Sequence, residues 1–356
     1  MRKTFVPLLL ALVAALTPLA ALAGKHPAKK HPPVEQQLPP FSESSEVRDF
    51  IQTMHEQYGF DFTHLTRQFD AIHSNAAVLR AIRPAAVPEL QRSWPRYRER
   101  FVNARRIGNG LRFWQENGAE LARAEAIYGV PPEIIAAIIG VETEYGRNMG
   151  NFSVLEALST LAFDYPPRAE FFRKELEQFL LLARENGVSP LDIKGSYAGA
   201  IGIPQFMPSS QRSYAVDFDG DDRIDLRNSA ADAIGSVARY LNIHGWQAGA
   251  PVAVPATVSG DPSALIAAGL KPVMPLQELL KHGVATSLAR GEPERPAALI
   301  DLVAPDQPTE YWVGFDNFYA ITRYNRSSFY AMSVFQLAEA LRDVHERSED
   351  DRPAGQ

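Results

Sequence analysis

PPEIIAAIIGVETEYGR, residues 131–147, is the stretch that decides the fold, because it predicts one helix with an almost wholly apolar interior. Two prolines open it, at positions where a missing backbone N–H costs nothing. Glu133 lies in the first turn, where the helix dipole favours a negative charge. Gly146 offers a stop at the C-terminal end. A helix that is apolar on most sides is expected in the protein core.

Glu142 is the polar residue of interest within this helix. On a wheel of about 100° per residue it continues the apolar face of Ile135, Ile138 and Ile139, whereas Glu144 falls on the opposite side. A carboxyl group against apolar side chains has a raised pKa, which suits a general acid near neutral pH. Glu142 is therefore the candidate acid, and Glu144 is expected to be a solvated or salt-bridged neighbour. The plainer alternative is that Glu142 is a surface residue near a helix end.

Composition narrows the class of protein. The 356 residues are enough for one or two sizeable cores. The net charge of −6 argues against a general nucleic-acid footprint. The absence of cysteine excludes disulfides, thiolate nucleophiles, zinc–thiolate sites and a lipid-modified N-terminal cysteine.

The N-terminal segment has the pattern of a secretory signal peptide. Arg2 and Lys3 precede an apolar run at 5–16, and Ala21-Leu22-Ala23 forms a small-residue cleavage pattern. An uncut membrane anchor is the alternative. Since no other stretch approaches membrane-spanning length, we expect an exported, soluble, periplasmic protein.

The rest of the chain predicts an α+β architecture that is mainly α. We expect a signal peptide at 1–23, a Pro/Lys-rich linker at 24–42, a helical domain at 43–130, a catalytic core at 131–250, a small β-rich insertion at 251–315, a return to the core with a final helix at 316–347 and a disordered tail at 348–356. Strands are predicted at 251–258, 298–303 and 311–315. Tyr97 belongs to a set of aromatics expected in the core, and it is also a candidate for stacking on sugar rings.

Small residues at 195–202 would let this backbone approach another group closely. The polar Ser196 lies within this run, and the polar Gln205 follows it. Buried polar groups need partners, and sugar hydroxyl and N-acetyl groups supply them in a carbohydrate site. Arg168 ends a Pro-containing turn, where it either holds a carboxylate or caps a helix.

Alternating aspartates predict a calcium loop. Asp217, Asp219 and Asp221 take positions 1, 3 and 5, and the Arg223 carbonyl takes position 7. Position 6 is Asp222 instead of Gly and position 12 is Asn228 instead of Glu, so Asp232 is the candidate bidentate ligand. A plain acidic turn is the alternative. With no second loop, we expect a structural ion instead of a sensor, and no organic cofactor.

These motifs together resemble the membrane-bound lytic murein transglycosylase B family, the lysozyme-like enzymes that cleave bacterial peptidoglycan. The resemblance rests on the Ile-Gly-Val-Glu-Thr motif at 139–143, the segment 195–210 that ends in Gln-Phe-Met-Pro-Ser-Ser, the aspartate loop, Asp-Ala-Ile-Gly-Ser at 232–236 and Ile-Thr-Arg-Tyr-Asn at 321–325. It extends from about residue 45 to about residue 345. It implies a lysozyme-like core, a helical domain and a small β domain.

The resemblance also implies roles for individual residues. Glu142 would be the single acid/base, and the aspartate loop would be a calcium site within the core. Ser196, Gln205, Tyr324 and Asn325 would line the glycan subsites, with Tyr97 and Tyr330 stacking on sugars and Arg168 near the substrate. Two features depart from the family: no cysteine is present to carry a lipid anchor, and Pro167 stands where an arginine is common, which weakens the expectation of stem-peptide contacts.

The activity implied is non-hydrolytic cleavage of the MurNAc–GlcNAc bond, which leaves 1,6-anhydro-MurNAc ends. The partners would be glycan strands, and possible further partners are cell-wall synthesis proteins; we expect a monomer. A muramidase would cut the same bond by hydrolysis with a second carboxylate. A non-catalytic glycan-binding protein has no use for a costly buried acid. Calcium-dependent signalling would need paired loops.

Overall fold

The central helix is present as α8 (Pro132–Thr143), but it ends earlier than the sequence pattern predicts. Pro131 is its N-cap, and nine of its twelve residues are buried. The chain leaves the helix at Glu144, whose φ of 52° and ψ of 50° are left-handed. The predicted continuation to Arg147 is therefore wrong, and the reason lies in contacts with another helix that are described below.

The computed structural model describes residues 38–84 and 93–350, which divide into two units after Ser74. The described part of the first unit contains η1 (Phe41–Glu43), α1 (Ser45–Tyr58) and α2 (Phe62–Asp70). Phe41 and Ser42 are buried there, so the expected linker ends before residue 42. The signal-peptide prediction at 1–23 lies outside the described residues.

The second unit begins at Asn75 and holds the remaining elements. Its helices are α3 (Ala76–Ile82), α5 (Trp94–Phe101), α6 (Ala104–Glu116), α7 (Gly118–Tyr128), α8, α9 (Val154–Phe163), α10 (Ala169–Glu185), α11 (Pro208–Tyr214), α12 (Ala230–Ile243), α13 (Ser263–Ala267), α14 (Leu276–Lys281), α15 (Asp316–Tyr324) and α16 (Ser328–Asp350), with 3-10 turns η2 (Pro166–Arg168) and η3 (Ser287–Arg290).

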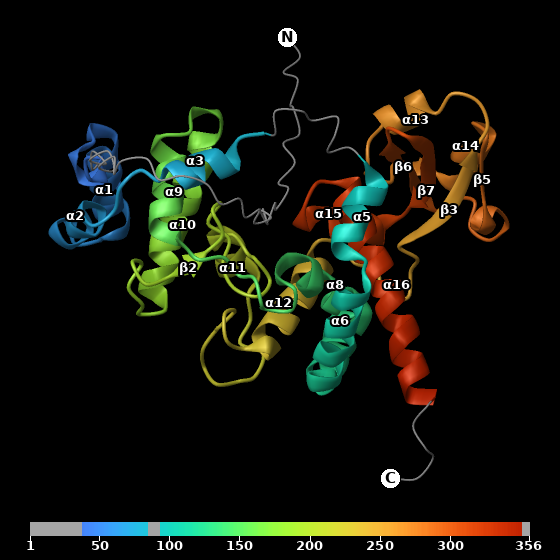
Figure 1. The fold of residues 1–356 in the computed structure, drawn as a ribbon, viewed down its shortest axis with the longest axis horizontal. Helices are drawn as coiled ribbons and strands as arrows, with labels where there is room; N and C mark the ends of the chain where they lie inside the picture. The colour runs from blue at the N-terminus through green and yellow to red at the C-terminus, as the bar shows by residue number, and fades with distance from the viewer. Residues whose placement is uncertain (1–37, 85–92, 351–356) are drawn as a thin grey trace, which may run out of the picture. The chain divides into compact units, whose positions relative to one another are not determined.

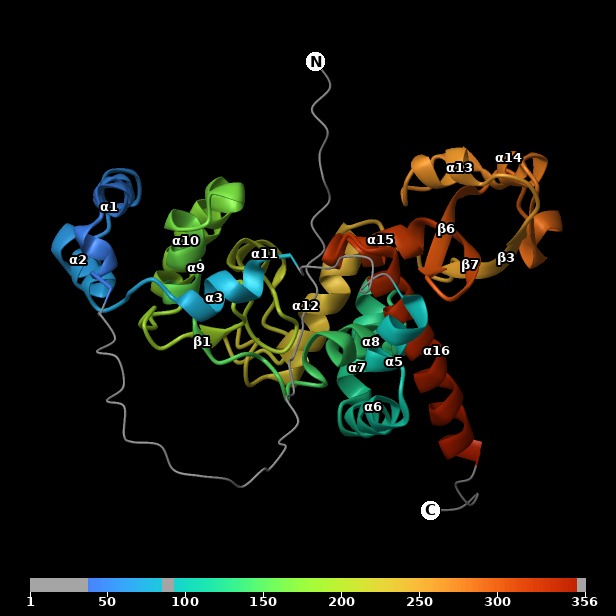
Figure 2. The ribbon, with the colours of Figure 1, turned by 45° about the horizontal axis from the view of Figure 1, so that its top comes forward.

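The expected helical domain at 43–130 is divided after Ser74, the boundary between the two units. Both α5 and α6 lie along α16 (Figures 1 and 2). Trp94 of α5 meets Phe329 of α16 with ring centroids 5.5 Å apart. Trp114 of α6 stacks on His345 at 4.2 Å. Large rings buried across helix pairs dominate the packing energy of such contacts, so α5 and α6 are part of the core of the second unit.

A five-stranded antiparallel sheet forms the β-rich part, with strand order β4-β6-β7-β3-β5. The strands are β3 (Ala253–Val258), β4 (Met274–Pro275), β5 (Val284–Thr286), β6 (Pro296–Ala304) and β7 (Gln307–Gly314). The sequence predicted β3, β6 and β7 and missed the short α13 and α14. Those helices accompany the sheet (Figure 2) and close a separate small core around Leu276, Leu299 and Val313.

A second, two-residue ladder shapes the surroundings of α8. It joins β1 (Phe152–Ser153) to β2 (Lys194–Gly195) in antiparallel register. Ile201 then bridges both Gly195 and Phe206. The small-residue segment predicted to approach another backbone therefore does so, and it folds back on itself directly after β2.

The last helix is longer than expected. The pattern placed its end near Glu346 and a frayed tail from 348, but α16 continues to Asp350. Within the described residues, no single helix is long and apolar enough to cross a membrane. Helices α7 and α8 reach that length and apolarity only together, as a pair bent by 114°.

Gly150 offers a test of the close approach beside β2. Its φ is 81°, and a Cβ there would collide with the carbonyl of Gly195, a backbone atom that has no freedom to swing away. We expect Gly150→Ala to lower the free energy of unfolding by about 3 kcal/mol, measured by urea denaturation. Gly187→Ala is the matched control, because Gly187 has a φ of 63° with open space around it and should cost only about 1 kcal/mol. Equal losses would contradict the crowding argument.

Candidate active site

Glu142 lies in the last turn of α8, where its side chain is half-buried. Its Oε1 accepts a hydrogen bond of 2.6 Å from the hydroxyl of Tyr330, on α16. Burial raises the pKa of Glu142 from 4.5 to about 7, and the bond from Tyr330 acts in the opposite direction. Near neutral pH this carboxyl group is thus present in both protonation states, as the position of Glu142 on the apolar face predicted.

Several buried phenols surround the acid. Tyr330 and Tyr324 have pKa values well above the usual value, chiefly because of burial and secondly because of the nearby charge of Glu142. Burial and Glu142 likewise raise the pKa of Tyr97, on α5. Neutral phenols can donate hydrogen bonds without bringing a positive charge that would keep Glu142 ionised. Burial, which outweighs the hydrogen bond from Tyr330, therefore favours the protonated form of Glu142.

The segment after β2 is tied directly to the helix that carries the acid. The hydroxyl of Thr143, the residue after Glu142, donates to the carbonyl of Ile203 at 2.8 Å. On the other side, the Tyr324 hydroxyl donates to the carbonyl of Pro204 at 3.3 Å. Elements far apart in the sequence, α8, the segment 195–206, α15 and α16, thus meet around Glu142.

Ser196 and Gln205, the two polar residues predicted in this segment, both hold its backbone. The buried Ser196 accepts a bond from the Ala200 N–H through Oγ at 3.0 Å. Gln205 has a left-handed φ of 51°, and its amide nitrogen donates to the carbonyls of Gly202 at 2.9 Å and Met149 at 3.2 Å. These backbone groups are the partners that buried polar side chains require. Ser196 and Gln205 therefore have a structural role in this segment.

The remaining predicted site residues take different positions. Tyr97 is buried between Phe101 and Phe329, with ring centroids 5.2 and 5.5 Å away. Asn325 is the C-cap of α15, directly after Tyr324. Arg168 is the N-cap of α10 without a side-chain capping bond, and its guanidinium lies 4.3 Å from the Phe171 ring.

Arg168 still borders the site segment. Burial lowers its pKa, and the charges of Glu175 and Tyr197 oppose that shift. Tyr197 is the neighbour of Ser196 in the chain, so Arg168 lies beside the segment that closes on α8.

The aspartate loop brings its first three carboxylates together. One oxygen from each of Asp217, Asp219 and Asp221 lies within 4.8 Å of the others. Asp217 also accepts the N–H groups of Gly220 at 2.7 Å and Asp222 at 2.9 Å, which curls the loop around it. Three convergent hard oxygens have the chemistry that calcium prefers.

Asp232 does not belong to this carboxylate group. It is buried, and its two oxygens accept the backbone N–H groups of Phe218 and Asp225, each at 2.7 Å. Its oxygens hold the loop against α12, and its assignment as the bidentate ligand stays a prediction.

Three residues that organise the site were not predicted as site residues from the sequence. Thr143 links the acid's helix to the segment 195–206. Phe218 fills the space beside Gly235, where a Cβ would meet its ring, and Arg123 donates to the Phe218 carbonyl and lies 3.9 Å from its ring. The glycine inside the Asp-Ala-Ile-Gly-Ser motif was the available signal for a closely packed ring.

Glu144 is the other correction. Its side chain is buried instead of solvated, and it forms an ion pair of 3.0 Å with Arg105. The salt-bridged alternative was right and the solvated one was wrong. The helical-wheel prediction for Glu144 assumed that this residue is helical, but α8 ends at Thr143.

A mainly helical core whose central helix presents one half-buried acid, accompanied by a small antiparallel sheet, defines a lysozyme-like protein. Comparison with known proteins agrees. The Transglycosylase SLT domain family matches residues 42–339. Membrane-bound lytic murein transglycosylase B of Escherichia coli (strain K12) is 42% identical over 316 residues, which cover 85% of this chain and 84% of that protein. The chain therefore belongs to the SLT-domain lytic transglycosylase family.

Solved structures agree with this assignment. Soluble lytic transglycosylase SltB1 of Pseudomonas aeruginosa is 48% identical, with a TM-score of 0.78 over 85% of this chain and 99% of that one. Escherichia coli Slt35 in complex with calcium is 41% identical, with a TM-score of 0.77 over 88% and 97%. Pseudomonas aeruginosa SltB3 in complex with NAG-anhNAM-pentapeptide is 31% identical, with a TM-score of 0.71 over 83% and 79%.

The bond between Tyr330 and Glu142 gives a prediction about pH. Because this bond lowers the pKa of Glu142, Tyr330→Phe should raise it, so the acid would stay protonated to higher pH. We expect the descending limb of the kcat profile, near pH 7 in the parent, to move upward by about one unit, with kcat about tenfold lower at its maximum. Tyr319→Phe on α15 is the control. An unshifted limb would show that the bond does not tune the acid.

Proposed function

We propose that this protein cleaves peptidoglycan as a lytic transglycosylase, with Glu142 as its single acid and base. The observation that carries the proposal is the half-buried Glu142 carboxyl, whose pKa of about 7 lies where one group can both give and take a proton. The family to which the chain belongs supports the reaction type.

In the first step, protonated Glu142 gives its proton to the glycosidic oxygen between MurNAc and GlcNAc. The bond from C1 of MurNAc to that oxygen breaks, and GlcNAc leaves with a new hydroxyl group. The 2-acetamido oxygen of MurNAc stabilises the oxocarbenium-like carbon, as in substrate-assisted glycosidases. The Tyr330 hydroxyl, 2.6 Å from Glu142 Oε1, stabilises the carboxylate that remains.

In the second step, the carboxylate of Glu142 removes the proton of the MurNAc C6 hydroxyl. The C6 oxygen attacks C1 and closes the 1,6-anhydro ring, so Glu142 returns to its protonated form and no water is consumed. Attack from within the same sugar gains from proximity. The buried phenols around the acid limit competition from water.

A hydrolytic muramidase is the second candidate, and it needs another carboxylate to activate water. Glu144 is the nearest carboxylate in the sequence, but Arg105 and Asn109 bind it at 3.0 Å each. Both of its oxygens therefore accept hydrogen bonds from α6, which makes it a poor base for activating water. This arrangement favours the transglycosylase.

Substrate contacts come from the segments that converge on Glu142. We assign the glycan subsites to Ser196, Gln205, Tyr324 and Asn325, and peripheral contacts to Tyr97 and Arg168. The buried Tyr330 serves the acid in this proposal instead of stacking on a sugar, because its hydroxyl is bonded to Glu142. The SltB3 complex with NAG-anhNAM-pentapeptide supports a peptide-bearing glycan as the ligand class.

Location follows from the sequence pattern. The signal-peptide pattern at 1–23 supports export to the periplasm, where peptidoglycan lies.

Product analysis tests the proposal. Purified peptidoglycan treated with the mature protein should yield muropeptides with 1,6-anhydro ends by mass spectrometry, and Glu142→Gln should lower their yield at least about 1000-fold, because the amide can neither give nor take the proton. Reducing ends in place of anhydro ends would indicate a hydrolase. Anhydro products at the parental rate from the variant would rule out Glu142 as the acid.

We also propose that the aspartate loop holds a structural calcium ion. Asp217, Asp219 and Asp221 would be the ligands, because like charges this close repel unless a cation neutralises them. The Arg223 carbonyl is assigned as a further ligand from its position in the loop. Slt35, a relative of this chain, is described in complex with calcium. The ion would fix the loop, not take part in the reaction.

Removal of calcium tests this assignment. An ion bound at 100 times its Kd adds about 2.7 kcal/mol to the stability of the folded state, so chelation should lower Tm by about 5–10 °C while turnover below that temperature persists. Asp219→Asn should abolish the effect of calcium on Tm. Asp222→Asn, one loop position outside the carboxylate group, should keep it. A Tm that does not respond to calcium would contradict the site.

A further inference from the structure

The chain leaves α8 through a turn that needs outside support. Three successive residues have left-handed φ values: 52° at Glu144, 61° at Tyr145 and 82° at Gly146. Two of them carry side chains, which rarely adopt this conformation. Such a turn persists only where the surrounding structure holds it. It begins two residues after Glu142, so it sets where the helix that carries the acid stops.

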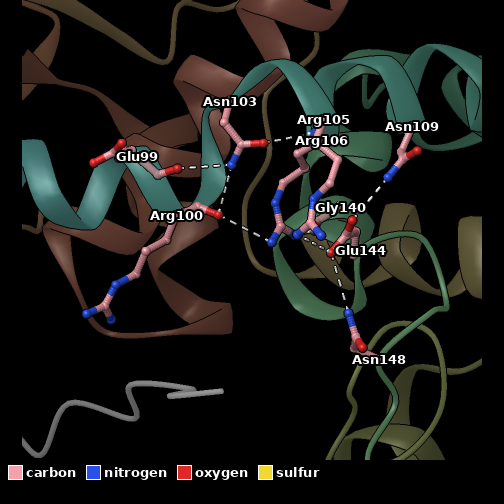
Figure 3. Close-up of polar contacts among 9 residues, drawn as sticks. All are labelled: Glu99, Arg100, Asn103, Arg105, Arg106, Asn109, Gly140, Glu144 and Asn148. Carbon is pink, nitrogen blue, oxygen red and sulfur yellow. Dashed lines mark hydrogen bonds and ion pairs between the residues drawn. The ribbon is translucent and has the colours of Figure 1, made fainter. Parts of the chain in front are cut away.

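The Glu144 side chain supplies the first support. Its buried carboxylate accepts bonds from Arg105 Nη2 at 3.0 Å, from Asn109 Nδ2 at 3.0 Å and from Asn148 Nδ2 at 3.5 Å (Figure 3). Arg105 and Asn109 both belong to α6, and Asn148 follows the turn. Charged and amide donors together replace the water that a buried carboxylate loses, so Glu144 fastens the turn to α6.

Arg106 supplies a second connection from the same helix. Its guanidinium donates to the carbonyl of Gly140, which also accepts the Glu144 N–H at 3.1 Å. Arg106 is buried and is held in turn by the Arg100 carbonyl at 3.3 Å (Figure 3). Carbonyl groups in the last turn of a helix need partners of this kind. The first turns of α6 therefore bind α8 two residues before and two residues after Glu142.

The turn controls the direction of neighbouring groups. The Thr143 carbonyl accepts the Asn148 N–H at 2.9 Å, and the Thr143 hydroxyl reaches Ile203. The local sequence by itself favours helix up to Gly146. If the helix continued to that point, these bonds of Thr143 would be lost, and the last turn would no longer be fixed where Glu142 meets Tyr330.

We propose that Glu144, held by Arg105 and Asn109, is a positioning residue for Glu142: it ends α8 where the acid meets the Tyr330 hydroxyl. The inference rests on the proposed function, because it takes Glu142 to be the acid. Loosening the turn should reduce the fraction of molecules in which Glu142 is bonded to Tyr330. That loss lowers kcat, leaves KM unchanged and moves the descending pH limb upward, which a change in overall stability would not do.

Three variants of the mature chain test this role, with soluble peptidoglycan fragments as substrate. Glu144→Gly accepts the left-handed φ and removes the whole side chain with its carboxylate, and we expect kcat to fall about tenfold with KM unchanged. Glu144→Gln should show the same change to a smaller extent. Arg105→Ala should lower kcat about threefold, and it should fold normally because the Arg105 side chain is 73% exposed. In all three, the descending limb should move to higher pH.

Glu278→Gln is the matched control, because it removes the same charge from an exposed pair with Lys281 on α14 and should keep the parental profile. Parental kcat and pH limb in Arg105→Ala overturn the inference, even if the Glu144 variants fail to fold. Glu142→Gln, assayed alongside, separates the two proposals. Full activity in Glu142→Gln removes both; an inactive Glu142→Gln beside parental Arg105→Ala removes only the positioning role.

Discussion

The structure of the site depends on one hydrogen bond, from the hydroxyl of Tyr330 to Oε1 of Glu142. Burial raises the pKa of Glu142 while this bond lowers it, and the resulting value of about 7 suits the proposed use of one carboxyl group in both steps. The bond joins α8 to α16, two helices that are far apart in the sequence. The packing of α5 and α6 along α16 therefore serves the chemistry as well as stability, because it holds the two partners at a fixed distance.

The same constraint explains why polar residues gather at the end of α8. A carboxyl group half-buried in an apolar helix is costly, and a small rotation of the last turn would separate it from Tyr330. Thr143 binds the segment 195–206, Arg106 binds the carbonyl of Gly140, and Glu144 binds α6. The two acidic residues of the motif thus have different tasks. Among residues 38–84 and 93–350, Glu142 has no cationic partner, which suits a group that exchanges a proton, and Glu144 is held in place by Arg105.

The sequence was sufficient for the parts that depend on local pattern. The apolar face placed Glu142 in the core, alternating residues located β3, β6 and β7, and the alternating aspartates located a carboxylate cluster. The sequence pattern did not show which distant segments contact one another. The spacing of Asp232 did not show that its two oxygens accept the backbone N–H groups of Phe218 and Asp225. Helices α5 and α6 looked like part of a helical domain, yet they pack on α16, because apolar periodicity shows that a face is buried without showing against what.

By itself, the sequence determined the helical core, the family and the apolar position of Glu142, since these follow from periodicity and from motifs that are contiguous in the chain. The tertiary structure alone decided where α8 ends, which phenol meets the acid and which carboxylate is held by arginine. The physical reason is that helix propensity changes by less than about 1 kcal/mol per residue. A buried carboxylate with three donors outweighs that preference, and those donors come from α6 and from the loop after the turn.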